Sequence, residues 1–185
     1  MTPHTKTITY GNEQAPLLER PWKRRNTMVP YYRIERMKPG QKWHDMTDPC
    51  KYSEHYVQLA DGPIPVGVMI ARELRDEGAI VAVCTDMTSN RLTLLSPNLI
   101  CVESSPPLSE LLDALRAANG GNLAGLPDAI AIFPDGRVAM REAKVAKKDR
   151  LNRPQHAFAP VARRLLGEKL DLAVIEWGYE AAEKT

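Results

Sequence analysis

One stretch of the sequence decides the fold: Pro127–Lys144, which reads PDAIAIFPDGRVAMREAK. Two apolar runs, 129–133 and 138–140, flank the turn residues Pro134-Asp135-Gly136. Proline presets φ at the first turn position, aspartate suits the second, and glycine accepts a left-handed third. This chemistry predicts a β-hairpin with a three-residue loop and a glycine bulge. Asp135 belongs to the turn, although it also follows a proline.

The register of this hairpin determines which side chains meet. With a three-residue loop Phe133 faces Arg137, and counting outward along both strands places Asp128 opposite Glu142. Facing residues lie on the same side of a sheet with Cβ atoms about 5 Å apart. Lys144 follows Glu142 by two residues and therefore shares that side. A two-residue loop would shift the register by one and place the two carboxylates on opposite faces.

Two carboxylates and a lysine on one surface are the groups needed to hold a hard divalent cation beside a phosphodiester. The chain that follows is basic, since residues 145–169 contain seven Lys and Arg but only two Asp and Glu. A basic segment beside an acidic metal site is typical of proteins that bind a polyanion. The alternative explanation of the same charges is a solvated helix face.

Composition indicates an ordinary globular protein. The chain has 185 residues, of which 43% are hydrophobic and 26% charged, with a net charge of +2. No apolar run approaches the length of a membrane span, and the first residues lack an apolar signal region. The three cysteines form no close pair, which indicates free thiols in a reducing compartment. We therefore expect a cytoplasmic protein with no membrane contact.

A zinc site is disfavoured. His44, Cys50 and His55 are the candidate ligands, but their spacing matches no common zinc pattern and a fourth ligand is not evident.

The chain divides into an N-terminal extension, residues 1–60, and a main domain, residues 61–185. Hydrophobic periodicity and turn residues predict the elements of the main domain. They are a helix over 66–77, a strand over 79–84, a hairpin of 91–95 with 99–103, a helix over 109–118, the hairpin at 128–144, a helix opened by the capping box Asn152–Gln155, and a final strand over 170–177. The last helix has Phe158, Val161 and Leu165 as its expected buried stripe, with a kink or a late start at Pro160.

The N-terminal extension is less regular. Residues 1–30 contain four prolines and are expected to be extended and poorly packed. Residues 20–43 mix cations with aromatic side chains, a composition that can bind a nucleic-acid backbone and stack on bases. The same composition suits an arm packed on the domain or on a second subunit. Both alternatives stand at the level of sequence.

This order of elements, with three local motifs, resembles the PD-(D/E)xK nuclease superfamily. The motifs are Gly125-Leu126-Pro127-Asp128, Arg141-Glu142-Ala143-Lys144, and Asp149-Arg150-Leu151 followed by Gln155. The VRR-NUC branch is the most similar, and the close likeness covers roughly 125–177. The resemblance implies a restriction-endonuclease-like α/β core, with a mixed central sheet flanked by helices. Residues 85–124 are then an insertion.

The resemblance implies a specific metal site. Asp128, Glu142 and Lys144 are the expected catalytic residues, and Mg²⁺ or Mn²⁺ is expected on Asp128, Glu142 and the backbone carbonyl of Ala143. We expect Lys144 to orient the attacking water, because two neighbouring carboxylates oppose the lowered pKa that a base needs. Glu73 is either a further ligand from the first helix or an ordinary exposed glutamate.

The resemblance also implies a nucleic-acid surface. Lys147, Lys148, Arg150 and Arg153 are expected to bind phosphates near the site. Gln155 is expected either to contact the scissile phosphate or Lys144, or only to cap its helix.

The leading functional hypothesis is a metal-dependent DNA endonuclease acting on structured or branched DNA in repair or a phage-related process. A homodimer is expected, because small nucleases of this kind pair to reach two strands. The first alternative is a non-cleaving nucleic-acid-binding or assembly component whose residues 1–60 hold a protein partner. The second is a restriction-type enzyme in which residues 85–124 recognise a sequence. The choice between DNA and RNA is open.

Overall fold

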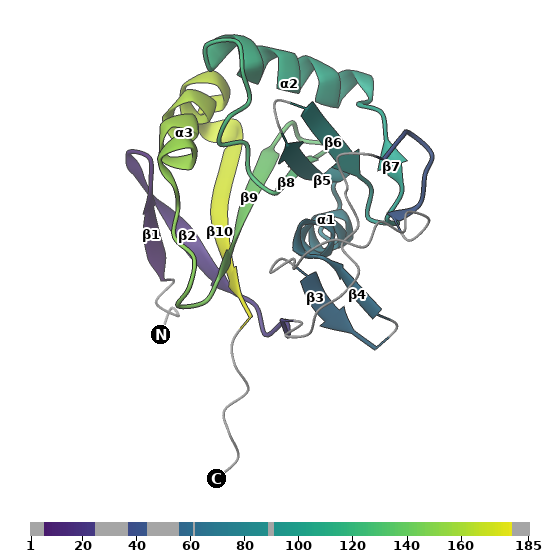
Figure 1. Cartoon of the computed structure of the whole chain (residues 1–185). Coiled ribbons are helices and arrows are strands. Elements are labelled where there is room, and N and C mark those ends of the chain that lie inside the picture. Colours follow the sequence, from purple (N-terminus) through teal and green to yellow (C-terminus); the bar gives the residue numbers. More distant parts are fainter. Residues whose placement is uncertain (1–5, 25–36, 44–55, 61, 89–90, 179–185) are drawn as a thin grey trace.

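Across the described residues the fold is built on one eight-stranded mixed sheet with helices on both faces (Figure 1). A computed structural model describes residues 6–24, 37–43, 56–60, 62–88 and 91–178. The sheet has the strand order β1-β2-β10-β9-β8-β5-β6-β7, and β3 and β4 form a separate pair. The predicted α/β class with a mixed central sheet is confirmed.

In chain order the elements are β1 (Thr7–Tyr10), β2 (Glu13–Glu19), β3 (Tyr56–Leu59), β4 (Gly62–Pro65), α1 (Val66–Asp76), β5 (Val81–Thr88), β6 (Arg91–Leu95), β7 (Cys101–Val102), α2 (Pro106–Ala118), β8 (Ala129–Ile132), β9 (Val138–Val145), α3 (Arg153–Leu166), the short 3-10 helix η3 (Gly167–Lys169) and β10 (Leu170–Trp177). Every helix and strand predicted in the main domain is present, with ends shifted by a few residues.

The hairpin of β8 and β9 has the predicted three-residue loop. Phe133 N–H donates to the carbonyl of Arg137 at 2.9 Å, which closes the loop. Gly136 adopts φ +82°, the left-handed conformation that the glycine bulge requires. The Oδ1 atom of Asp135 accepts the N–H of Arg137 at 3.0 Å, so this aspartate does stabilise the turn.

The hairpin lies in the middle of the sheet. β5 pairs antiparallel with β8 on one side, and β10 pairs parallel with β9 on the other. A parallel pair needs a crossover connection, and α3 supplies it between β9 and β10. α1 precedes β5 in the chain.

The two faces of the sheet carry different helices. Even-numbered residues such as Ile130 and Met140 belong to a core shared with α2 and α3. Odd-numbered residues such as Ala131 and Ala139 belong to a second core that includes buried side chains of α1. The separation follows from the alternation of side chains along a strand. It also decides which helices can reach Asp128 and Glu142.

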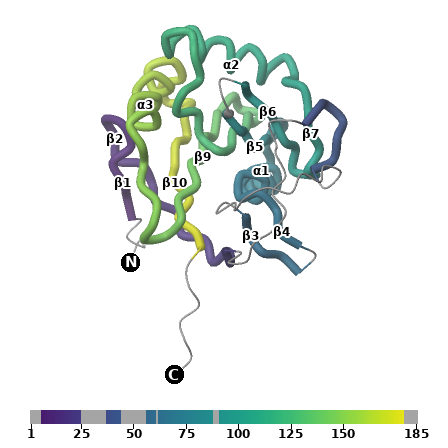
Figure 2. The backbone as a smooth tube through the Cα atoms, viewed as in Figure 1, coloured from purple at the N-terminus to yellow at the C-terminus, as the bar shows by residue number. Residues whose placement is uncertain are grey.

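The N-terminal extension differs from expectation. β1 and β2 form a hairpin, and β2 joins the main sheet by pairing parallel with β10, as Figures 1 and 2 show. Tyr10 is completely buried and Ala15 nearly so, both in the core shared with α2 and α3. The expectation of poor packing is wrong for residues 7–19, because the outer edge of β10 and the side of α3 give this hairpin a surface to cover.

Other described parts of the extension are packed as well. Trp43 is buried in a third core with Tyr56 and Leu95, and Trp22 packs against the core of α1. These contacts favour the packed arm over a nucleic-acid grip for the described part of 20–43. The remainder of that segment, 25–36, lies outside the described residues, as do His44, Cys50 and His55.

α3 begins at Arg153 and continues through Pro160, so a late start at this proline is wrong. Its buried residues include Phe158, Ala159 and Ala162, whereas Leu165 is 41% exposed. The expected stripe of Phe158, Val161 and Leu165 is therefore wrong in part. The N-terminal hairpin covers the helix from one side and brings small alanines into the core.

Two expectations for the whole chain concern membranes and thiols. Among the helices that the structure describes, none combines the length and apolar character needed to cross a bilayer. Cys84 and Cys101 are buried free thiols, and Cys50 lies outside the described residues.

Candidate metal-binding site

The register of β8 and β9 brings Asp128 and Glu142 to the same face. Ala129 pairs with Arg141, so Asp128 and Glu142 are the next two residues that face each other across the strands. The carbonyl of Asp128 accepts the N–H of Thr85 from β5 at 2.9 Å, which fixes its backbone. Its Oδ2 atom accepts the N–H of Ala143 at 2.7 Å, so the side chain reaches across to β9. The predicted meeting of the two acidic positions is confirmed.

Glu142 is the most enclosed of the predicted site residues, with 2% of its surface exposed. Its Oε1 atom accepts a hydrogen bond from Nε2 of Gln155 and lies 2.9 Å from Nζ of Lys144. Its Oε2 atom is buried and has no hydrogen-bond partner. A buried acceptor without a donor is costly, and the neighbouring charge of Asp128 adds to the cost, so a proton or a cation would stabilise this oxygen.

The electrostatics of the site favour a bound cation. Burial raises the pKa of Glu142 well above 4.5, and the nearby charge of Asp128 raises it further. Lys144 acts in the opposite direction but does not cancel these effects. A divalent cation would stabilise both carboxylates in their charged form.

The donor set suits magnesium with a partial water shell. The N–H and C=O of one strand residue point to the same side, so the carbonyl of Ala143 also points toward Asp128, to which its N–H donates. Two carboxylates and one carbonyl leave several positions for water, the usual arrangement for Mg²⁺. Within the described residues no group of three or more His, Cys, Asp or Glu forms a metal site.

Gln155 connects the site to α3. Its backbone N–H donates to Asn152 Oδ1 at 3.0 Å, and its Oε1 atom accepts the N–H of Asn152 at 2.8 Å, which completes the predicted capping box. The side-chain nitrogen remains free to donate to Glu142, and it does so. Gln155 therefore caps the helix and holds Glu142 with the same side chain. The contact with Glu142 was not among the sequence-based expectations, which named Lys144 or a phosphate.

A close backbone approach fixes the position of α3 beside the acidic pair. Gly125 adopts φ +86°, and a Cβ atom on it would overlap the carbonyl of Pro154 in the first turn of α3. Only glycine accommodates both the conformation and the contact. The loop that carries Asp128 is thus packed against the turn that carries Gln155.

The predicted phosphate-binding cations lie on the connection from β9 to α3 and at the first residue of α3. Lys147, Lys148, Arg150 and Arg153 are all exposed. The carbonyl of Val145 accepts the N–H of Lys148 at 3.1 Å, and the resulting turn places these cations directly after Lys144. The side chain of Lys144 itself is 13% exposed.

Glu73 is not brought to the acidic pair. It lies on α1, whose core is on the other face of the sheet, and both of its carboxylate oxygens accept a hydrogen bond from Nε of Arg20 at 2.9 Å. The sequence left two alternatives for Glu73, a metal ligand or an exposed glutamate. In the structure it instead forms an ion pair with Arg20 of the N-terminal extension.

Tyr10 is a site neighbour that sequence reasoning missed. Its buried hydroxyl has no hydrogen-bond partner. Burial raises the pKa of this phenol above 10, and the charges of Glu142 and then Asp128 add to the effect. Its ring packs edge-on to His156 at 6.4 Å between centroids, next to Gln155. No local pattern links Tyr10 to residue 142, so no sequence signal pointed to it.

Comparisons with known proteins give no significant match for this chain, whether to family models, to curated proteins or to solved structures. The assignment of function therefore depends on the geometry of the site.

Proposed function

We propose that this protein is a metal-dependent endonuclease that hydrolyses phosphodiester bonds in DNA. The observation that carries the proposal is the juxtaposition of Asp128 and Glu142 in a buried corner where one oxygen of Glu142 has no partner. Lys144 contacts Glu142, and four exposed cations follow it within nine residues of the chain. On this proposal the strands β5, β8, β9 and β10 with α1 and α3 form a restriction-endonuclease-like core of the PD-(D/E)xK type, nearest to the VRR-NUC branch.

Asp128, Glu142 and the carbonyl of Ala143 would hold Mg²⁺ or Mn²⁺. When bound, the ion would supply Lewis-acid stabilisation of the phosphoryl group and a more acidic water. Lys144 orients that water and offsets negative charge on the phosphate oxygens. Gln155 keeps Glu142 in position through its hydrogen bond.

The substrate is proposed to be structured or branched DNA, in repair or a phage-related process in the cytoplasm. Lys147, Lys148, Arg150 and Arg153 would contact phosphates, which position a nucleic acid without reading its sequence. A homodimer would present two such sites to two strands. A restriction-type enzyme is distinguished by cleavage at one repeated sequence.

A non-cleaving nucleic-acid-binding component is the second candidate. The absence of a third acidic ligand among the described residues favours it. The extension, whose described parts are packed on the domain, would then serve an assembly role with a protein partner.

Cleavage assays separate the two candidates. Plasmid and branched DNA are incubated with Mg²⁺ or Mn²⁺ and with wild type, Asp128→Asn or Lys144→Ala. Asp135→Asn is the matched control, because Asp135 also follows a proline but serves only the hairpin turn. The nuclease proposal expects cutting by wild type and Asp135→Asn and none by the other two variants. Salt-sensitive binding without cutting by any of them supports the non-cleaving component.

A further inference from the structure

Thr85 of β5 is a neighbour of the acidic pair that the proposed chemistry does not use. Cys84 pairs with Ala129, so Thr85 and Asp128 are the next two residues that face each other. Facing residues share one side of the sheet. Thr85 is 6% exposed. Any role that it has in the site is therefore exerted through the residues that it contacts.

Thr85 holds the segment that leads into β8 by two hydrogen bonds. Its backbone N–H donates to the carbonyl of Asp128 at 2.9 Å. Its hydroxyl donates to the carbonyl of Pro127, which is a side-chain contact outside the strand ladder. Pro127 and Asp128 both precede β8, which begins at Ala129. One residue of β5 therefore binds the two consecutive carbonyls that deliver the Asp128 side chain.

The ladder between β8 and β9 assigns a different donor to the Pro127 carbonyl. The N–H of Phe133 donates to the carbonyl of Arg137, so these two residues form a hydrogen-bonded pair. Hydrogen-bonded and non-hydrogen-bonded pairs alternate along an antiparallel ladder. Continued at this register, the alternation makes Pro127 and Ala143 a hydrogen-bonded pair. The N–H of Ala143 would then donate to the carbonyl of Pro127.

The structure replaces that ladder bond with two side-chain bonds. The Pro127 carbonyl accepts from the hydroxyl of Thr85, and the N–H of Ala143 donates to Oδ2 of Asp128 at 2.7 Å. The exchange brings the Asp128 carboxylate across to β9, which carries Glu142. Because proline has no N–H, residue 127 also offers no donor to the carbonyl of Ala143, the third group of the proposed metal site.

We propose that Thr85 is a positioning residue of the metal site: its hydroxyl occupies the Pro127 carbonyl and so leaves the Ala143 N–H to hold Asp128. Pro127 is buried, so without this hydroxyl its carbonyl needs another donor, and the Ala143 N–H is the one that the ladder supplies. The Asp128 carboxylate then loses its bond to β9. The effect on a metal ion rests on the proposed function, whereas the acceptor chosen by Ala143 is a property of the protein alone.

The test compares Thr85→Val, which is nearly isosteric but lacks the hydroxyl, with Thr85→Ser, which keeps it. In EDTA, NMR couplings through hydrogen bonds identify the acceptor of the Ala143 N–H. We expect coupling of the Ala143 nitrogen to Cγ of Asp128 in wild type and Thr85→Ser, and to the carbonyl carbon of Pro127 in Thr85→Val. Calorimetric titration with Mn²⁺ should show affinity at least about tenfold weaker in Thr85→Val and close to wild type in Thr85→Ser.

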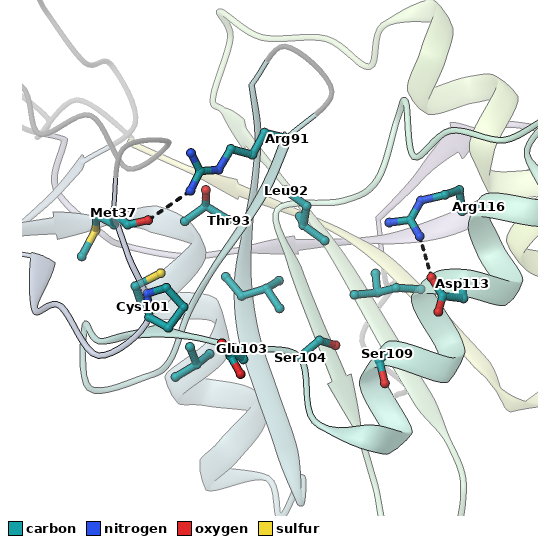
Figure 3. A pocket seen from close by; sticks show the side chains of 14 residues that line it. Met37, Arg91, Leu92, Thr93, Cys101, Glu103, Ser104, Ser109, Asp113 and Arg116 are labelled. Atoms are coloured by element: carbon teal, nitrogen blue, oxygen red, sulfur yellow. Dashed lines mark hydrogen bonds and ion pairs between the residues drawn. The ribbon is translucent and has the colours of Figure 1, made fainter.

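Thr93→Val is the matched control. Thr93 is a buried threonine on β6, the strand next to β5 (Figure 3), and its Oγ1 atom has no hydrogen-bond partner among the described residues. It pairs with Asp86, so its side chain faces the other side of the sheet from Thr85. The same loss of a hydroxyl should here change neither the acceptor of Ala143 nor the affinity for Mn²⁺.

Thr85→Ala is a second variant without the hydroxyl and should reproduce the result of Thr85→Val. A loss of stability with Ala143 still bonded to Asp128 in both variants is what a purely structural role predicts, and it would overturn the proposal. Equal loss of Mn²⁺ affinity in Thr85→Ser would overturn it as well. Absence of Mn²⁺ binding by wild type would contradict the proposed function, and the couplings would still decide whether Thr85 directs Ala143 to Asp128.

Discussion

At the scale of single residues, the two oxygens of Glu142 have unequal surroundings. Oε1 accepts from Gln155 and contacts Lys144, whereas Oε2 is buried without a donor. A buried carboxylate without full compensation destabilises the folded state, and the charge of Asp128 adds repulsion. Either a proton on Glu142 or a cation beside it would therefore stabilise the folded state.

This cost predicts a pH dependence of stability. Because the pKa of Glu142 is higher in the folded than in the unfolded chain, the folded state binds its proton more tightly, and stability falls as pH rises above about 4.5. Each unit between the two pKa values is worth about 1.4 kcal/mol. In urea unfolding with EDTA, wild type should lose more stability between pH 5 and pH 8 than Glu142→Gln. Mg²⁺ should reduce the difference; identical pH profiles would contradict the prediction.

Tyr10→Phe tests the other unpartnered group of the site. The substitution keeps the ring and its edge contact with His156 but removes a hydroxyl that has no partner. We expect the free energy of unfolding to rise by about 1 kcal/mol, since desolvation of that hydroxyl is no longer required. Thermal unfolding measures the change. A lower melting temperature would mean that the hydroxyl is satisfied in solution, for example by a buried water.

At the scale of elements, the first turn of α3 acts as a support for the site. It carries Gln155, which holds Glu142, and it packs on Gly125 in the loop that leads to Asp128. The contact between this loop and the start of α3 therefore supports both acidic residues, in addition to the strand pairing of β8 and β9.

Gly125→Ala tests this contact. Gly125 and Gly121 share φ +86°, but a Cβ atom on Gly121 would meet nothing within 4 Å. Gly121→Ala should cost about 1 kcal/mol for backbone conformation alone. Gly125→Ala should cost about 3 kcal/mol or more, because overlap with Pro154 is added. Urea unfolding measures the loss of unfolding free energy in each variant. Equal losses would show that the contact between Gly125 and Pro154 does not contribute to stability.

The parts of the site that could be predicted from sequence are local ones. The turn chemistry of Pro134-Asp135-Gly136 sets the register of β8 and β9, and the register sets the meeting of Asp128 with Glu142. Asn152 and Gln155 are three residues apart, so their capping box is also visible. The partner of Glu73 is Arg20, which directly follows β2, and Tyr10 lies on β1; both are far away in the chain from the residues that they contact. Their packing depends on the parallel pairing of β2 with β10, which no local pattern encodes.

At the scale of the whole molecule, charge is arranged around the acidic pair. Lys147 and Lys148 lie on the turn after β9, at the end of the strand that carries Glu142. Lys169 lies near Gly136, close to the hairpin loop at the opposite end of β9. A nucleic acid bound at the acidic pair would therefore contact Lys147 and Lys148 but not Lys169.

If the protein binds DNA as proposed, the salt dependence of that binding measures these contacts. Each phosphate contact contributes about 0.9 to the slope of log K against log salt for duplex DNA. Replacing both Lys147 and Lys148 by Gln should reduce that slope by about 2, while Lys169→Gln should leave it unchanged. Fluorescence anisotropy with a labelled duplex at several salt concentrations gives the slopes. An unchanged slope in the double variant would place the DNA elsewhere.

The pairing of β2 with β10 has a consequence for biosynthesis. The hairpin of β1 and β2 is translated well before β10, the strand that it pairs with. Contacts of such long sequence separation form slowly, because a large loop must close first. A nascent chain that stops before Leu170 lacks the strand that joins β9 to the hairpin, so its central layer remains divided. Unfinished chains of this kind would lack Leu170, Leu172 and Val174, which share a core with Tyr10.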